Sequence, residues 1–299
     1  MERIHAVTFA PFCARGTFEK EETRQSLKLM KEKTGANYVI FAPNGVQKTA
    51  FSENIDYRTK RNVSDEELTA MIAYAKQLGL KVALKPTANC EDGTWRAHIN
   101  FFDEDVVCEP KWSNWFASYR AFQEHYARLA QQCGVDLFIA GCEMVQTERR
   151  EAEWREAIAA IRRKYDGLVS YNTDKYQEHN VKWWDAVDVI ASSGYYPLED
   201  WENQLDRIEA VVKKFQKPFF FAEAGCMSIV DSNKVPNDWT VQGEADVKGQ
   251  ADWYEAMFEA CEKRDWLKGM AFWSWNPKLP TREQALLMGD YEIYQKPAE

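Results

Sequence analysis

Paired cysteines and clustered histidines, the usual signs of disulfide frameworks and metal sites, are both missing from this sequence. Its seven Cys residues form no C-x-x-C pair and are odd in number, so we interpret them as free thiols in a reducing compartment. The four His residues are scattered along the chain, whereas a metal-dependent hydrolase needs His ligands gathered at one site. We therefore expect neither a metal nor another cofactor.

Long apolar segments and nucleotide-binding motifs are missing as well. No stretch approaches the roughly 20 apolar residues of a membrane span, and the first residues lack the apolar core and cleavage site of a signal peptide. These absences predict a cytoplasmic protein without a membrane partner. Neither G-x-G-x-x-G nor G-x-x-x-x-G-K-[ST] occurs, which removes the usual nucleotide-binding folds. The net charge of −9 argues against a nucleic-acid partner and fits neutral substrates.

Apolar runs typical of buried strands recur along the chain, with amphipathic helix patterns between them. We expect strands at residues 5–12, 38–43, 82–86, 137–143, 168–172, 189–195, 219–223 and 270–275. We expect helices at about 19–33, 64–78, 115–133, 154–165, 201–215 and 250–263. Strict alternation predicts a parallel sheet, and eight such units predict an α/β fold with a single-domain (β/α)₈ TIM barrel over residues 1–299.

The lengths of the connections predict that a pocket forms at one end of this barrel. Links from helix to strand are short, whereas those from strand to helix are long, notably residues 44–63, 87–114 and 226–249. Long loops at the C-terminal ends of the strands are what a barrel enzyme needs to form a pocket. Trp95, Trp112 and Trp239 lie in these loops, either as outer platforms for a substrate or as hydrophobic plugs.

Two of the apolar runs end in a single carboxylate. Glu143 closes the fourth run and Glu223 the seventh, eighty residues later. A buried strand has no use for an unpaired charge in its interior, so carboxylates at these ends mark a candidate active site. Two facing carboxylates suit the cleavage of a glycosidic bond. The alternative is structural, with both residues salt-bridged to Lys or Arg at the barrel mouth.

Amides, a lysine and aromatic residues stand at the other strand ends. Aromatic faces stack on the C–H faces of a pyranose, while polar groups bind its hydroxyls, so we interpret this set as substrate-binding. We expect only one of the two Trp residues at the last strand to face the barrel lumen and serve as a sugar platform. The set comprises Lys85, Asn89, Asn172, Tyr195, Trp273 and Trp275.

Four short motifs resemble a known group of enzymes. Gly-Cys-Glu at residues 141–143, Gly-Tyr-Tyr-Pro at 194–197, Phe-Ala-Glu-Ala-Gly at 221–225 and Trp-Ser-Trp at 273–275 resemble the clan A retaining β-glycosidases. Together with the spacing of eighty residues between the carboxylates, they most resemble glycoside hydrolase family 113, whose members are chiefly endo-β-1,4-mannanases. The resemblance covers nearly the whole chain.

The resemblance implies a role for each matched residue. Glu143 would be the general acid/base and Glu223 the nucleophile of a double displacement through a covalent glycosyl-enzyme. Tyr195 would hydrogen-bond the nucleophile, and Trp273 would form the floor of the −1 subsite. These roles imply a raised pKa for Glu143 and a low one for Glu223. The implied substrate is mannan or a manno-oligosaccharide.

Cys142 departs from the wider clan, where Asn directly precedes the acid/base and binds the sugar 2-hydroxyl. A thiol is a poor hydrogen-bonding substitute, and family 113 relaxes this position, so Cys142 favours that family. The partner of the 2-hydroxyl stays open between Lys85, Asn89 and Asn172.

Other functions stay open at this point. An exo-β-mannosidase, a β-glucanase or a xylanase would share the barrel and both carboxylates, and a catalytically silent sugar-binding barrel would share the fold. A Cys nucleophile at Cys142 or Cys226 would need a His at a strand end to activate it, and none stands there. A cytoplasmic enzyme would act on imported oligosaccharides.

Overall fold

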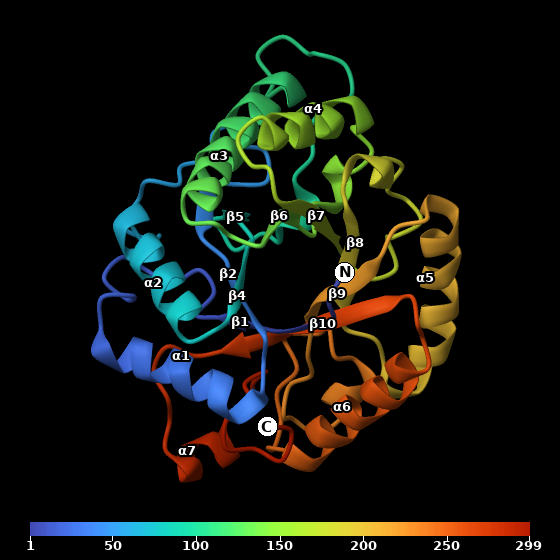
Figure 1. Ribbon diagram of the computed structural model, residues 1–299. Helices are drawn as coiled ribbons and strands as arrows, with labels where there is room; N and C mark the ends of the chain where they lie inside the picture. The colour runs from blue at the N-terminus through green and yellow to red at the C-terminus, as the bar shows by residue number, and fades with distance from the viewer.

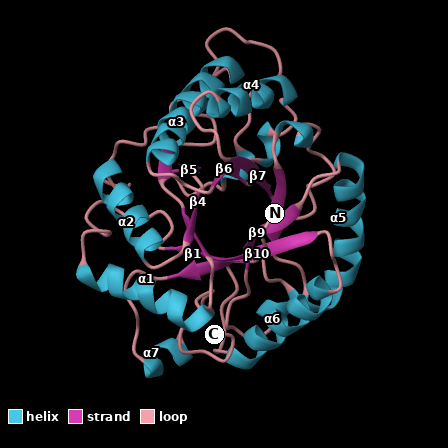
Figure 2. Cartoon of the chain, in the orientation of Figure 1, coloured by secondary structure: helices cyan, strands magenta, loops and turns pink.

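Eight parallel strands close into a barrel that a ring of helices surrounds (Figures 1 and 2). The computed structural model describes residues 1–299, and the strands follow the order β1-β10-β9-β8-β7-β6-β4-β2 around the ring. The predicted TIM barrel is therefore confirmed. The strands are β1 (Ile4–Phe9), β2 (Tyr38–Phe41), β4 (Lys81–Leu84), β6 (Leu137–Cys142), β7 (Leu168–Thr173), β8 (Val189–Gly194), β9 (Phe219–Ala224) and β10 (Leu267–Trp275).

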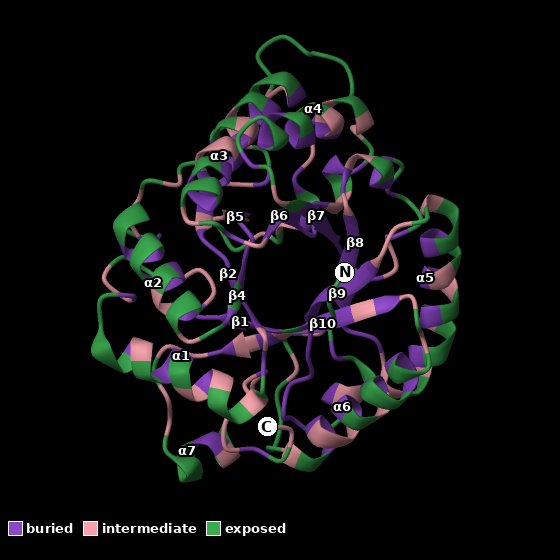
Figure 3. Cartoon of the chain, viewed as in Figure 1, coloured by how far each residue is buried: buried purple, intermediate pink, exposed green.

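All six predicted helices form on the outside of the barrel. Buried and exposed residues alternate along each helix, which Figure 3 shows as purple and green bands separated by pink ones. Helix α2 begins with a complete capping box between Ser64 and Glu67, as its sequence pattern predicts. No helix is both long and apolar enough to cross a membrane. The helices are α1 (Glu21–Thr34), α2 (Asp65–Gln77), α3 (Trp112–Gln132), α4 (Glu151–Arg162), α5 (Trp201–Phe215) and α6 (Val247–Glu262).

Two short strands and one short α-helix have no counterpart in the sequence prediction. The strands β3 (Asn44–Gln47) and β5 (Thr87–Cys90) pair with each other as a separate parallel ribbon, and α7 (Arg282–Leu287) follows the last barrel strand. The ribbon continues the second and third barrel strands beyond the mouth, so it ties down the two long loops at residues 44–63 and 87–114. Each element is too short to give a periodic apolar pattern.

Alternate residues of the strands fill the barrel lumen, and the others pack against the helices. Both faces of the sheet are thus apolar, which explains the continuous apolar runs in the sequence. The lumen is lined by Ile4, Ala6, Tyr38, Ile40, Ala83, Leu137, Ile139, Val189, Ala191, Phe220, Ala222 and Ala271.

Most of the tryptophan content serves packing between the helices and the barrel. The rings of Trp154 and Trp183 stack with centroids 4.8 Å apart. Trp112 is buried and packs edge-on against Phe101 at 4.8 Å, so it is a plug and not a platform. Seven Trp side chains are almost fully buried, namely Trp115, Trp154, Trp183, Trp184, Trp201, Trp253 and Trp275.

Gly141 lets the end of β6 approach helix α3 closely. Its φ is +113°, and an added Cβ would lie 2.2 Å from the Tyr119 hydroxyl oxygen. That hydroxyl donates to the carbonyl oxygen of Ala140 at 3.0 Å. Only glycine fits both the backbone conformation and the space at this position.

Gly141→Ala should lower the free energy of unfolding by about 2–5 kcal/mol, because left-handed strain and overpacking act together. Gly16→Ala is the matched control, since Gly16 has φ +85° with no atom within 4 Å of an added Cβ. Denaturant unfolding of both variants measures the difference. Equal losses would show that Tyr119 moves aside without cost.

Candidate active site

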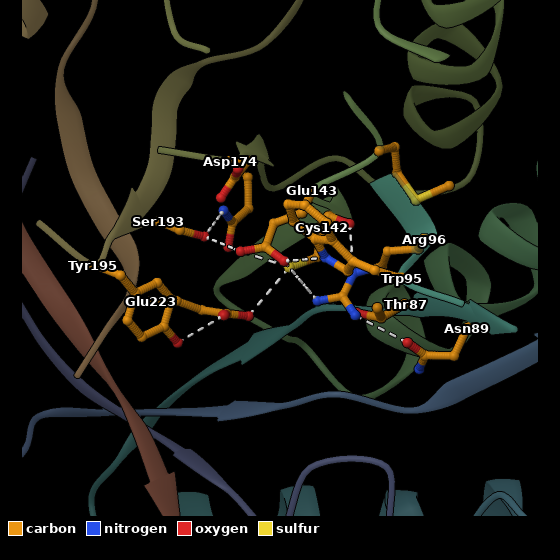
Figure 4. Close-up of polar contacts among 12 residues, drawn as sticks. Thr87, Asn89, Trp95, Arg96, Cys142, Glu143, Asp174, Ser193, Tyr195 and Glu223 are labelled. Atoms are coloured by element: carbon orange, nitrogen blue, oxygen red, sulfur yellow. Dashed lines mark hydrogen bonds and ion pairs between the residues drawn. The ribbon is translucent and has the colours of Figure 1, made fainter. Parts of the chain in front are cut away.

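The two strand-end carboxylates meet at the C-terminal mouth of the barrel (Figure 4). Glu143 directly follows β6, and Glu223 lies near the end of β9. One oxygen of each carboxylate and the sulfur of Cys142 all lie within 4.8 Å of one another. Both Glu residues are buried, with 7% and 2% of their surfaces exposed. The structure thus brings together the pair that the sequence analysis singled out.

Glu223 is held by three donors. Lys85 Nζ lies 2.5 Å from Oε1, Cys142 Sγ lies 3.1 Å from the same oxygen, and the Tyr195 hydroxyl donates to Oε2 at 3.1 Å. Burial raises the pKa of Glu223, but the positive charges of Lys85 and Arg96 outweigh it and leave the pKa below its ordinary value. Glu223 is therefore an ionised carboxylate at neutral pH, as a nucleophile requires.

Glu143 is contacted by a different set of donors. The indole N–H of Trp95 and the guanidinium of Arg96 both reach Oε2 at 3.1 Å, and the Ser193 hydroxyl donates to Oε1 at 2.7 Å. Figure 4 shows Trp95 and Arg96 approaching from one side and Ser193 from the other. Trp95 is 40% exposed, so this carboxylate oxygen lies at the edge of the solvent-accessible mouth.

The separation of the two carboxylates decides between two kinds of chemistry. Retaining glycosidases place their carboxyl groups about 5–5.5 Å apart, whereas inverting enzymes need roughly 6.5–9.5 Å to admit a water. One oxygen of Glu143 lies within 4.8 Å of one oxygen of Glu223, which fits retention. A thiol and two carboxylates could also hold a soft cation, but Lys85 and Arg96 already neutralise both carboxylates.

Lys85 and Asn172 lie beneath the carboxylates and are fully buried. The Asn172 side chain accepts from Lys85 at 3.4 Å and donates to Ser193 at 3.1 Å. Asn89 is half-buried, and its amide oxygen accepts from Arg96 at 3.0 Å. All three candidates for the 2-hydroxyl partner are thus engaged in supporting charged groups of the site.

Trp273 and Trp275 lie on opposite faces of β10. The pairing of β1 with β10 shifts by one residue between Trp273 and Trp275, so that the intervening residue is passed over. Residues two apart in a regular strand share a face, and one extra residue reverses this. Trp273 faces the mouth, where its ring centroid lies 5.6 Å from Lys85 Nζ.

Trp275 points the other way, into the core. It is fully buried, and its indole N–H donates to the Ser26 hydroxyl of α1 at 3.1 Å. The prediction of Trp275 as a substrate-binding residue is therefore wrong, and Trp273 is the member of the pair that reaches the site.

Arg96 and Ser193 are site residues that the sequence analysis missed, and the contact of Trp95 with Glu143 was not foreseen. Arg96 begins a single 3₁₀ turn, Arg96–His98, inside a long loop, where no periodic pattern marks it. Ser193 directly precedes the Gly-Tyr-Tyr-Pro motif of residues 194–197, but a single serine in a strand gives no signal of its own. Trp239, 53% exposed, lies edge-on to Trp273 with ring centroids 6.2 Å apart and so extends the aromatic wall outward.

A (β/α)₈ barrel with paired carboxylates at the ends of its fourth and seventh strands defines a glycoside hydrolase. The model of Glycoside Hydrolase Family 113 matches residues 7–296. The chain therefore belongs to glycoside hydrolase family 113, and its substrate is a carbohydrate.

Solved structures are similar over the whole chain. A GH113 β-1,4-mannanase, determined as a complex, is 52% identical with a TM-score of 0.98, covering 100% of this chain and 96% of that one. The GH113 β-mannanase of Alicyclobacillus acidocaldarius, in complex with ManMIm, is 41% identical with a TM-score of 0.95, covering 100% and 95%. The β-glucuronidase of Ruminococcus gnavus, at 13% identity and a TM-score of 0.65 over 99% and 49%, shares the fold alone. No curated protein sequence matches the chain.

The two Trp residues of β10 should respond oppositely to substitution by Phe. Trp275→Phe removes the bond to Ser26 and should lower the free energy of unfolding by about 1–3 kcal/mol, with kcat/KM nearly unchanged. Trp273→Phe should lower kcat/KM by about tenfold, because a smaller ring offers a weaker sugar platform. Steady-state kinetics and denaturant unfolding of both variants test this. A larger kinetic effect from Trp275→Phe would contradict the assignment of faces.

Proposed function

We propose that this protein is a β-1,4-mannanase that cleaves mannan or manno-oligosaccharides with retention of configuration at the anomeric carbon. The observation that carries the proposal is the carboxylate pair within 4.8 Å, one member ionised by a buried lysine. The choice of mannose is supported by the two family members described above as mannanases, at 52% and 41% identity.

The first step forms a covalent glycosyl-enzyme. Glu223 attacks the anomeric carbon with a carboxylate oxygen while Glu143 gives its proton to the departing glycosidic oxygen. The C–O bond to the leaving sugar breaks, and an ester bond to Glu223 forms. Tyr195 keeps the attacking group oriented, since its hydroxyl donates to Glu223 Oε2 at 3.1 Å.

The second step returns the enzyme to its starting state. Glu143, now a carboxylate, takes a proton from water, and the hydroxide oxygen attacks the same anomeric carbon. Glu223 leaves as a carboxylate, which the buried ammonium group of Lys85 stabilises. Two inversions give net retention.

The proposal that the enzyme cleaves within a sugar chain rests on two aromatic side chains at the mouth of the barrel. Trp239 and Trp95 are exposed aromatic side chains, the first next to the Tyr195 and Trp273 side and the second next to Glu143. We propose that they contact sugars on either side of the cleaved bond, as an endo-acting enzyme needs. The cytoplasmic location and the lack of nucleic-acid or membrane partners stay predictions.

Wild type should cleave mannohexaose internally, while Glu143→Ala and Glu223→Ala should lose several orders of magnitude in kcat/KM. Chromatography of the products from mannohexaose, cellohexaose and xylohexaose checks both the activity and the sugar. On 2,4-dinitrophenyl β-mannobioside, whose phenolate leaves without a proton, azide should rescue Glu143→Ala and give a β-mannobiosyl azide, because a small anion replaces the water that needs a base.

The alternative functions predict other outcomes of the same assay. Stepwise release of mannose would indicate an exo-β-mannosidase. Cleavage of cellohexaose or xylohexaose alone would leave the mechanism intact and overturn the mannanase assignment. Binding without cleavage of any of the three would indicate a silent sugar-binding barrel.

Lys85→Met should move the acidic limb of the pH–kcat/KM profile to higher pH. Glu223 must be ionised to attack, so activity is lost as the pH falls through its pKa, which Lys85 holds below the ordinary value. Without the ammonium group, burial dominates and the pKa of Glu223 rises. Lys81→Met, at the start of the strand that Lys85 follows but half-exposed, is the control and should leave the limb in place. An unmoved limb in Lys85→Met would show that Lys85 does not set the ionisation of Glu223.

A further inference from the structure

Glu143 sits in a backbone conformation that needs support. Its φ is +52°, a left-handed conformation that costs a residue with a side chain of this size about 1–2 kcal/mol. Such conformations persist where the surroundings fix them from several sides. Here the N–H of Glu143 donates to the carbonyl of Asn172 at 2.7 Å, and the next N–H, of Met144, donates to the Tyr171 hydroxyl at 3.1 Å.

The Tyr171 hydroxyl is oriented by Glu148. It donates its single proton to Glu148 Oε1 at 2.8 Å, which leaves its lone pairs facing Met144. The Thr173 hydroxyl donates to the same carboxyl oxygen at 2.6 Å. Glu148 is only 4% exposed, and its Oε2 has no partner. A buried carboxyl group thus ends a chain of hydrogen bonds that begins at the catalytic turn.

No cation neutralises Glu148. The charged groups that face it are Asp174 and Glu178, from the segment after β7, and these are paired with Lys175 and Arg207 respectively. Burial raises the pKa of Glu148 to about 8, against the opposing effect of the bonds from Thr173 and Tyr171, and the two acidic neighbours raise it further. At neutral pH the group is a neutral carboxylic acid, which removes the cost of a buried unpaired charge.

We propose that Glu148 is a positioning residue for Glu143, because it orients the Tyr171 hydroxyl that holds the left-handed turn and so aims the acid/base at the glycosidic oxygen. The proposal rests on the acid/base function of Glu143 described above. Glu148 itself touches no substrate, since it lies in the loop that follows β6 and its carboxyl group is buried against Tyr171 and Thr173 of β7.

The test distinguishes a misplaced Glu143 carboxyl group from a loss of structure throughout the active site. Glu148→Leu and Tyr171→Phe are assayed on mannotetraose and on 2,4-dinitrophenyl β-mannobioside, whose phenolate leaves without a proton. We expect kcat/KM on mannotetraose to fall about 10- to 100-fold, because misplacement of a catalytic group by about 1 Å has effects of this size. On the aryl substrate kcat/KM should stay nearly unchanged.

Two further variants are controls. Glu148→Gln should restore wild-type kinetics, because the amide oxygen still accepts from Tyr171. Thr173→Val removes the other bond to the same oxygen without touching Met144, so it should lower stability while leaving the ratio of the two kcat/KM values unchanged. The double variant of Glu148→Leu with Tyr171→Phe should lose no more than either single variant, as one chain of contacts requires.

The outcomes are distinct. Equal losses on both substrates, or no loss on mannotetraose, would overturn the positioning role. A wild type inactive on both substrates would instead overturn the proposed function. If Glu148→Leu fails to fold, Tyr171→Phe, which removes one oxygen atom, carries the same test.

The protonation of Glu148 has its own signature in stability. Between the ordinary carboxyl pKa and about 8, the folded chain holds a proton on Glu148 that the unfolded chain has lost, so the free energy of unfolding falls as the pH rises. Glu148→Gln should remove the contribution of this carboxyl group to the fall in the free energy of unfolding with pH. Identical pH slopes for wild type and Glu148→Gln would show that the carboxyl group is already ionised.

Discussion

Two carboxylates buried side by side are stable only when each has a compensating charge. Moving the Glu223 carboxylate out of water costs several kcal/mol even after relaxation, and a second negative charge within 4.8 Å, whenever Glu143 is ionised, adds repulsion to that cost. Lys85 at the end of β4 compensates Glu223, and Arg96 from the loop after β5 compensates Glu143. Removing either cation would leave a buried charge unpaired, so the loops and strands around the mouth are organised by these two ion pairs.

The two ion pairs differ in a way that divides the chemistry. Glu223 and Lys85 are both sealed from solvent, so the carboxylate keeps its charge in a fixed environment. Glu143 shares its cation with the Cys142 carbonyl and Asn89, and one of its donors is the exposed Trp95. Glu143, at the edge of the mouth, can exchange protons with a leaving group and with water. Glu223, sealed from solvent, can only attack the anomeric carbon and later leave it. Environment thus assigns different functions to two identical side chains.

The strands, the six main helices and both carboxylates were predicted from sequence because each has a local signal. Buried parallel strands are apolar throughout, and a charge can stand only where they end. Arg96 has no such signal, because its role follows from where a long loop folds back onto the mouth. Trp275 could not be placed, because the one-residue shift that turns it toward Ser26 arises from the pairing of β1 with β10. Lys85 and Asn172 were found as strand-end residues, but only the packed structure shows that they lie under the carboxylates.

The order of strands around the ring also shows which strands the buried ion pair links. Lys85, Arg96, Glu143 and Glu223 all lie between residues 81 and 224, on the uninterrupted arc β4-β6-β7-β8-β9 or in its loops. The closing seam, where β10 meets β1, adds only the aromatic floor around Trp273. Lys85 follows β4 and Glu223 lies on β9, and these two strands stand opposite each other on the ring with three strands between them on either side. The buried ion pair therefore spans the mouth of the closed barrel and links two strands that share no backbone hydrogen bonds.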